Sequence, residues 1–247
     1  KDVSLDPELL GKVFENLLAS YNPETQQTAR KQTGSFYTPR EIVQYMVDES
    51  LVAHLKRTVG DELEDEYRKL LAYADSETVL TEQQKLAIMQ SLYNCRILDP
   101  ACGSGAFPVG VLQQMVHILK QIDPDNSRWK NMLLQFAIDE TSEAYLTSTA
   151  EERREAVADI ERAFDENVNY PDYARKLHLI ENCIYGVDIQ PIAIQISKLR
   201  FFISLVIDQQ RNDNPADNFG IRPLPNLEAK FVAANSLLGL KKTEATL

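Results

Sequence analysis

Apolar positions near the start of the chain recur at helical spacing. An acid followed by a proline, Asp6 and Pro7, is typical of a helix start, because proline suits the first helical position. The apolar stripe that follows consists of Leu9, Leu10, Val13, Phe14, Leu17, Leu18 and Tyr21. Residues 22–36 are polar and contain a glycine, so we expect a loop after this helix.

A second helical pattern begins at Thr38-Pro39-Arg40-Glu41. These residue types predict a capping box, with Thr38 as the N-cap, Pro39 at the first helical position and Glu41 at the third. Farther along, residues 59–69 are acidic and residues 76–92 have helical spacing. We expect these two stretches to form a solvated helical insert.

The second part of the chain alternates short apolar runs with helical patterns. Strands are predicted at Arg96–Asp99, Cys183–Asp188 and Phe231–Asn235. A strongly apolar helix is predicted after each of the first two, over residues 106–122 and 191–207. This alternation favours the α/β class, with a parallel sheet and helices on both of its faces.

No strand is evident from residue 123 to residue 177. Residues 151–166 alternate acids, arginines and alanines, which is typical of a solvated helix face. We therefore predict an N-terminal helical region over residues 1–92 and a sheet domain over residues 93–247. The sheet domain would contain a helical insert at about 123–178.

The composition is that of an ordinary folded chain. Of its 247 residues, 44% are hydrophobic and 26% are charged, which allows one large domain or one domain with a sizeable insert. No apolar stretch reaches the roughly 20 residues of a membrane span, and the N-terminus lacks the apolar core of a signal peptide. Cys95, Cys102 and Cys183 lack metal-ligand spacing, which suits a reducing cytoplasm.

The net charge of −11 argues against strong nucleic-acid binding by this chain alone. Proteins that bind DNA usually present a basic surface, because neutralising phosphates supplies most of the affinity. If the chain belongs to a DNA-modifying protein, we expect most of the DNA-binding surface to lie elsewhere.

The segment from Asp99 to Phe107 combines a charge, a turn and a helix start. An apolar strand ends in Asp99, and Gly103 and Gly105 allow close approach to the backbone before an apolar helix begins. Doubly wound sheets hold adenosine-bearing cofactors at such a turn. A dinucleotide fingerprint requires a third glycine where this chain has Pro108. Without a ligand, the same segment is a tight turn in which Asp99 caps the helix.

A second acid, Asp188, ends the second predicted strand. A carboxylate at this place can accept hydrogen bonds from both hydroxyl groups of a ribose. The two positions are usually about 20 residues apart, whereas Asp99 and Asp188 are separated by the whole predicted insert. Either the insert is real or the pairing is false, and Asp188 is also suited to cap the helix that follows it.

Two further segments carry candidate residues. Phe36 and Tyr37 come just before the predicted cap at Thr38, and capping does not explain two aromatic residues there. Asn235 ends the third predicted strand. Its amide oxygen can accept a hydrogen bond from a ligand, or it is simply a polar strand end.

Together these motifs resemble those of the gamma-class N6-adenine DNA methyltransferases. Phe-Tyr-Thr-Pro, Asp-Pro-Ala-Cys-Gly-Ser-Gly and Gly-Val-Asp-Ile-Gln-Pro occur here in that family's order. In particular, the chain resembles the methylase region of type IIG restriction–modification fusions. The resemblance implies a partial Rossmann-like fold that binds S-adenosylmethionine (SAM).

The resemblance also implies a role for each motif. Thr38 would hold the SAM carboxylate, Asp99 the ammonium group and Asp188 the ribose. Asn235 would bind the adenine amino group, at a position where the family often has an aspartate. The implied cofactor-binding residues are Phe36, Tyr37, Thr38, Asp99, Pro100, Ala101, Cys102, Gly103, Ser104, Gly105, Phe107, Asp188, Ile189 and Asn235.

One motif of that family is absent from the chain. N6-adenine methylation there uses Asn/Asp/Ser-Pro-Pro-Tyr/Phe after the third strand, and no two prolines are adjacent in this sequence. The first residue is also not a methionine. We expect a fragment that begins inside a longer polypeptide and ends before the catalytic loop, so no catalytic residue is assigned. No metal ligand is expected either, since His54, His117 and His178 each stand alone.

The parent protein would then be a site-specific, adenine-specific DNA methyltransferase in the cytoplasm of a bacterium or archaeon, with or without a fused endonuclease. It would contact double-stranded DNA through parts outside this chain and would not contact a membrane. Two alternatives remain open. One is a SAM-dependent methyltransferase of RNA or protein, and the other is a methyltransferase-fold scaffold without catalysis.

Overall fold

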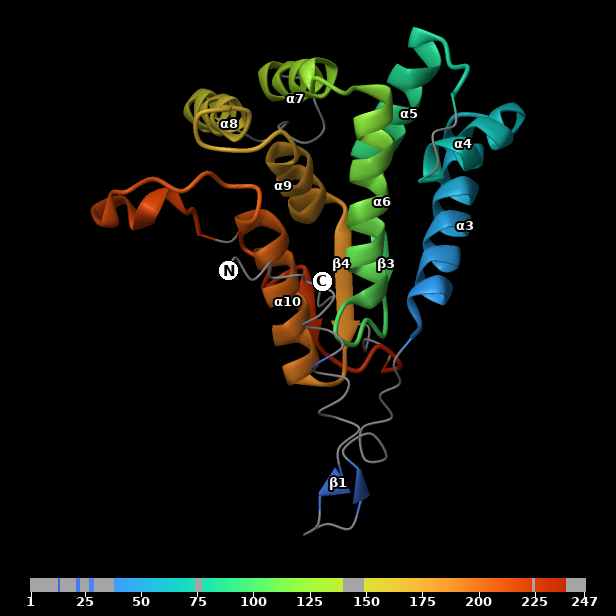
Figure 1. Cartoon of the computed structure of the whole chain (residues 1–247), viewed down its shortest axis with the longest axis vertical. Helices are drawn as coiled ribbons and strands as arrows, with labels where there is room; N and C mark the ends of the chain where they lie inside the picture. Colours follow the sequence, from blue (N-terminus) through green and yellow to red (C-terminus); the bar gives the residue numbers. More distant parts are fainter. Residues whose placement is uncertain are drawn as a thin grey trace, which may run out of the picture.

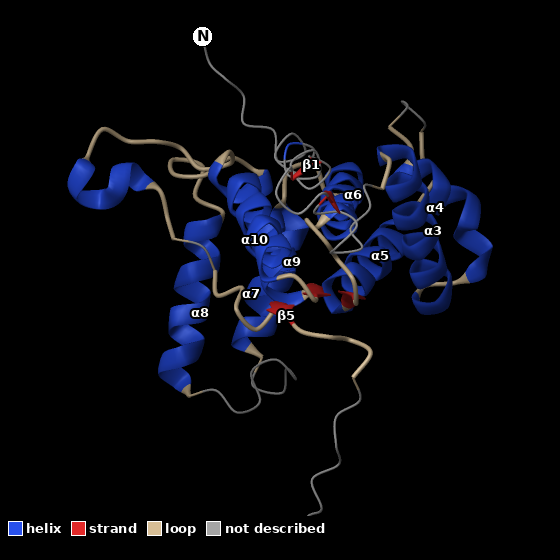
Figure 2. Cartoon of the chain, turned by 90° about the horizontal axis from the view of Figure 1, so that it is seen from below, coloured by secondary structure: helices blue, strands red, loops and turns tan. Residues whose placement is uncertain are grey.

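The computed structural model describes residues 13, 21–22, 27–28, 38–73, 77–139, 149–223 and 225–238. Within them, helices lie mostly on one side of a small sheet (Figures 1 and 2). The helix predicted from residue 7 onward lies almost wholly outside this part of the chain and stays a prediction. Strand β1 (Tyr21–Asn22) pairs antiparallel with β2 (Gln27–Thr28). Tyr21 was expected on the helical stripe and is in a strand instead, whereas the other three residues lie in the segment expected to be a loop.

Three parallel strands form the predicted sheet, which confirms the α/β class. They are β3 (Ile97–Asp99), β4 (Ile184–Asp188) and β5 (Phe231–Ala233), with β4 in the centre. Asp99 lies opposite Gly186, which is two residues before Asp188 on β4. Because side chains alternate along a strand, Asp99 and Asp188 point to the same face of the sheet.

Three helices pack on one face of the sheet. Helix α6 (Ala106–Ile122) follows β3 and α10 (Pro191–Val206) follows β4, as predicted. Helix α9 (Asp172–Asn182) packs beside them and leads into β4. Phe201 of α10 lies against Phe231 of β5, with ring centroids 4.8 Å apart.

The other face of the sheet is largely open among the described residues. Leu98 of β3 is 60% exposed and Val232 of β5 is 40% exposed. In Figure 2 the helices that contact the strands, α6, α9 and α10, lie on the opposite side. The expectation of helices on both faces is therefore not met within the described chain.

The segment expected to be a solvated insert is part of the core. After α3 (Arg40–Thr58), it forms a short 3-10 helix η1 (Asp61–Leu63), α4 (Glu64–Leu71) and α5 (Glu82–Asn94). Tyr67, Leu70, Ile88 and Met89 are all 0% exposed. The expectation was wrong because abundant acids on the outer face of α4 mask an apolar inner face.

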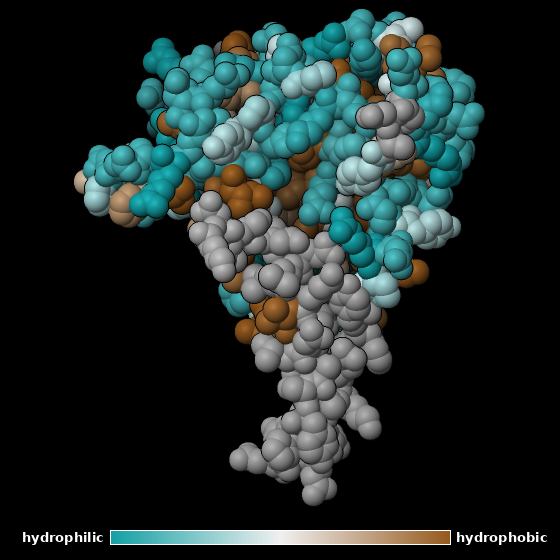
Figure 3. All heavy atoms as spheres, in the orientation of Figure 1, coloured by the Kyte–Doolittle hydropathy of each residue, from teal (hydrophilic) through white to brown (hydrophobic). Residues whose placement is uncertain are grey.

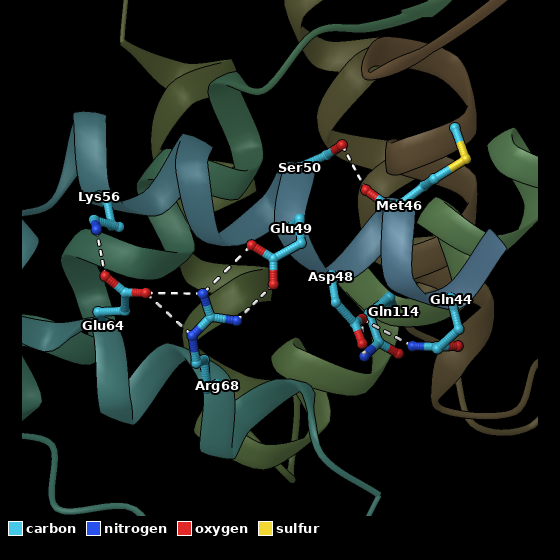
Figure 4. A network of polar contacts seen from close by, with 9 residues as sticks. All are labelled: Gln44, Met46, Asp48, Glu49, Ser50, Lys56, Glu64, Arg68 and Gln114. Carbon is cyan, nitrogen blue, oxygen red and sulfur yellow. Dashed lines mark hydrogen bonds and ion pairs between the residues drawn. The ribbon is translucent and has the colours of Figure 1, made fainter. Parts of the chain in front are cut away.

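Polar contacts tie α3 to two neighbouring helices (Figure 4). Arg68 of α4 contacts Glu49 at 2.7 Å and Glu64 at 2.8 Å. Gln114 of α6 is 1% exposed, and its side-chain amide donates to Asp48 of α3 at 3.0 Å. Helix α3 is thus held against α6, the helix that begins at the glycine turn.

Residues 123–178 are mainly helical where they are described, as expected. They form α7 (Ser127–Ile138), α8 (Ala150–Ala163) and the start of α9. On α8 only Ala163 is buried, which confirms a solvated helix. A 3-10 helix, η3 (Pro215–Gly220), lies in the proline-containing loop before β5.

A single buried hydrophobic cluster includes residues from both predicted regions, 1–92 and 93–247. The boundary between these regions stays a prediction. None of the described helices is long and apolar enough to cross a bilayer.

Candidate functional site

Thr38 stands before α3 but does not cap it. The helix begins at Arg40, and the main-chain carbonyl of Pro39 accepts a hydrogen bond from the amide of Val43 at 3.1 Å. No side chain caps this end. The predicted capping box of Thr38 and Glu41 is therefore wrong, because the extended backbone of Pro39 (ψ 146°) delays the helix by one residue. The half-buried Thr38 side chain is not engaged with the first turn.

The turn between β3 and α6 contains two glycines in the left-handed region. Gly103 has a φ of 53° and Gly105 a φ of 84°. A Cβ added to Gly105 would lie 2.7 Å from Ser197 Oγ, whereas nothing lies within 4 Å of a Cβ added to Gly103. Packing and backbone together require glycine at position 105. Gly103 instead borders open space, where a ligand can approach the backbone.

Two side chains of α10 hold the carbonyl groups of this turn. Ser197 Oγ donates to the Gly103 carbonyl at 3.0 Å, and Arg200 Nη1 donates to the Ser104 carbonyl at 2.9 Å. Both side chains are buried, with Ser197 0% and Arg200 4% exposed. Neither residue stands out in the sequence. The available signal is a serine and an arginine three residues apart in a mainly apolar helix.

Asp188 contacts the glycine turn directly. Its Oδ2 accepts a hydrogen bond from the Gly103 amide at 2.9 Å, and its Oδ1 accepts one from the Gln190 amide at 2.8 Å. The amide of Ala234, after β5, donates to the main-chain oxygen of Asp188 at 2.9 Å. The fold therefore brings Asp188 to the turn after β3, in spite of the helical insert between them.

Asp99 lies beside this arrangement and does not cap α6. The N-cap of α6 is Gly105, without a side-chain cap, whereas Asp99 Oδ1 accepts a hydrogen bond from the Ala101 amide at 3.1 Å. The pKa of Asp99 is raised above its usual value. Burial is the main cause and the charge of Asp188 adds to it, whereas the hydrogen bond from the Ala101 amide acts in the opposite direction. Two neighbouring carboxylates at one sheet edge favour a positively charged ligand group.

Cys102 is buried within the turn. Burial, followed by the charges of Asp99 and Asp188, raises the pKa of its thiol to about 12. A thiol with this pKa stays protonated at neutral pH, and the thiolate is the nucleophilic form. Burial and this raised pKa favour a packing role for Cys102 in the turn.

The remaining candidates are less closely grouped. Asn235 follows β5 at the same edge, is exposed, and accepts a hydrogen bond from the Leu237 amide at 3.0 Å. Ile189 is 63% exposed. Phe36 and Tyr37 lie outside the described residues. The structure thus brings together the turn at residues 99–105, Asp188 and the loop that contains Asn235. In the described ranges, no group of three His, Cys, Asp or Glu is placed to hold a metal ion.

Comparisons with known proteins show what the chain is similar to. Residues 5–63 match the family model described as N-6 DNA Methylase. The chain is also 28% identical to a Methanocaldococcus jannaschii protein provisionally named a type II restriction enzyme and methyltransferase. That alignment covers 97% of this chain but 17% of the relative, so the chain spans a small part of that protein. No solved structure matches the chain.

The family match includes Thr38 and the start of α3. The alignment with the archaeal protein extends over nearly all of this chain. The chain is therefore similar to the N-6 DNA methylase family over residues 5–63 and to the archaeal protein over nearly all of its length.

Proposed function

We propose that this chain is the SAM-binding part of an adenine-N6 DNA methyltransferase of a restriction–modification system. The observation that carries the proposal is the 2.9 Å hydrogen bond from the Gly103 amide to Asp188, made at the carboxyl ends of parallel strands. Open α/β sheets bind their ligands outside that edge. The family match supports a methyl donor, and the name of the archaeal relative supports the restriction–modification role.

The residues at this edge suit the chemistry of SAM, which carries a sulfonium and an ammonium group. Asp99 is the partner of the ammonium group and Asp188 the acceptor for the ribose hydroxyls. The open space beside Gly103 gives the cofactor access to the backbone. Asn235 Oδ1 already accepts one hydrogen bond and has a second lone pair for the adenine amino group. Thr38, with Phe36 and Tyr37 before it, is the proposed contact for the carboxylate end.

When bound, SAM supplies an activated methyl group for an adenine flipped out of the duplex. The residues of this chain bind and orient the cofactor, and such positioning lowers the entropic part of the barrier. The sequence contains no adjacent prolines and so lacks the family's Pro-Pro motif. Binding of the flipped adenine is therefore not assigned to this chain. Because the chain has a net charge of −11, other parts of the parent protein would contact double-stranded DNA. The parent protein would act in the cytoplasm of a prokaryote.

Titration calorimetry of the chain with SAM tests cofactor binding. We expect Asp188→Ala to weaken binding about tenfold or more, because hydrogen bonds to a charged group contribute roughly 1.5–3 kcal/mol. Glu155→Ala, an exposed acid on α8, is the matched control and should bind SAM like the parent chain. The absence of SAM binding by a folded sample, or equal binding by folded Asp188→Ala, would contradict the proposal.

A methylation assay tests where catalysis resides. With SAM and unmethylated DNA, the chain alone should transfer no methyl groups. Efficient transfer by the chain alone would show that the residues receiving adenine lie within it. Transfer to RNA or protein but not to DNA by the parent enzyme would replace the proposed substrate.

A further inference from the structure

A cavity of about 410 Å³ lies in the helical layer, at the opposite end of the sheet from the two acids. Its lining comes largely from α8 and α9. Helix α9 ends at Asn182, just before the amino end of β4, whereas Asp188 is at the carboxyl end of that strand (Figure 1). The cavity is therefore separate from the candidate cofactor site.

Stacked aromatic rings form one wall of this cavity. His178 of α9 stacks on Tyr93 of α5 with ring centroids 4.6 Å apart, and Tyr93 stacks on Phe136 of α7 at the same distance. Burial lowers the pKa of His178 to about 3, so the imidazole is neutral near pH 7. Its Nε2 atom is buried and has no partner with hydrogen-bond geometry in the described chain. The wall thus offers mainly apolar surface.

Charged side chains of both signs stand at the mouth. Asp159 and Arg162 of α8 contact each other at 3.0 Å and have side chains 73% and 45% exposed. Glu181 of α9 and Arg222 also line the cavity and are exposed. No ion pair within the described ranges engages Glu181 or Arg222. The mouth therefore carries two carboxylates and two guanidinium groups and no net charge.

We propose that this cavity binds a small zwitterion with an apolar side chain, of the class of free apolar amino acids. Its volume falls within the range of about 300–1,000 Å³ that is usual for small-molecule sites. The side chain of the ligand packs on the rings of Tyr93 and His178. Its ammonium group faces Glu181 and its carboxylate faces Arg222. The balanced charge of the mouth disfavours polyphosphates and polyamines. On the face shown in Figure 3, the surface of the helical layer is mainly hydrophilic.

L-Phenylalanine is the probe for this proposal, titrated into the whole chain and followed by calorimetry and ligand-observed NMR. Two analogues each remove one charge: 2-phenylethylamine lacks the carboxylate and 3-phenylpropionate lacks the ammonium group. We expect L-phenylalanine to bind and each analogue to bind at least tenfold more weakly. Glu181→Gln and Arg222→Gln, both surface substitutions, should each weaken L-phenylalanine binding about tenfold.

A matched pair of variants on α8 locates the binding. Ala156 lines the cavity, whereas Ala158 on the same helix is exposed and does not. Ala156→Phe fills the cavity and should abolish binding of L-phenylalanine, and Ala158→Phe should leave it unchanged. No binding to the folded parent chain, equal binding of all three compounds, or undiminished binding by both surface variants would overturn the proposal. Asp188→Ala should keep L-phenylalanine binding while binding SAM about tenfold or more weakly, so the two proposals fail independently.

Discussion

The two ends of the central strand β4 are built in different ways. At the carboxyl end, Asp188 and the side chains of α10 hold the glycine turn through directional hydrogen bonds at 2.9–3.0 Å. At the amino end, helices enclose a cavity against stacked rings and a buried neutral histidine. A substitution at the first end therefore removes a specific bond or creates a clash. A substitution at the second end changes volume, burial or local helix stability.

The largest effect is expected at Gly105. Gly105→Ala combines left-handed strain of about 1–2 kcal/mol with overpacking of about 1–3 kcal/mol against Ser197. Gly103→Ala is the matched control, because its Cβ would meet no atom within 4 Å and only the strain remains. Urea unfolding followed by circular dichroism measures both. Equal destabilisation of the two variants would show that α10 does not crowd the turn.

The next effect concerns the carbonyl groups held by α10. Arg200→Met removes a buried charged donor and should lower the free energy of unfolding by about 2 kcal/mol, and Ser197→Ala by about 1 kcal/mol. Both should also weaken SAM binding, because the turn is no longer held. Gln195→Ala, exposed on the same helix, is the control and should change neither quantity. Unchanged SAM affinity in folded Arg200→Met would contradict a positioning role.

At the amino end of β4, the comparison predicts a pH effect from His178. Burial first, and the nearby Arg96 charge second, lower its pKa from 6.5 to about 3. Because the unfolded chain binds this proton more readily, the stability contribution is complete above pH 6.5 and is lost as the pH falls toward 3. His178→Phe keeps a ring against Tyr93 without the titration. Its unfolding free energy should fall less between pH 6.5 and 4 than that of the parent chain, and parallel curves would contradict this.

The smallest effect is expected at the solvated helix α8. Thr149 and Glu152 form a capping box, as Thr81 and Gln84 do on the buried helix α5. Thr149→Ala removes a cap of about 1 kcal/mol, and this loss should appear as faster amide exchange confined to α8. Thr81→Ala should lower the free energy of global unfolding, since α5 belongs to the core. Global destabilisation by Thr149→Ala would show that α8 unfolds together with the sheet.

The strands and the glycine turn could be predicted because their signals are local. Each strand is a short apolar run, and the helix after β3 was predicted over the same residues, 106–122, that form it. A charge or a glycine at the end of a strand has few structural roles other than capping or turning the chain. This is why we could select Asp99, Gly103, Gly105 and Asp188 from the sequence. Thr38 shows the limit of this reasoning. Its residue type suits a cap, but the backbone of Pro39 carries that role.

Interactions between distant segments could not be predicted from local patterns. Tyr67 and Leu70 lie in an acidic stretch, and only their packing against α3 and α6 shows that they are buried. Ser197 and Arg200 acquire their role because α10 lies against a turn more than ninety residues earlier in the chain. No spacing rule reports such a contact.

The sequence by itself determined the class of the fold, the three strands and the chemistry of the turn, because each depends on neighbours a few residues apart. Tertiary structure decided that Asp188 meets Gly103 across a long helical insert, and that this insert encloses a cavity of its own. Both depend on where helices pack. Packing is set by the summed burial of apolar surface over the whole chain and not by any one motif.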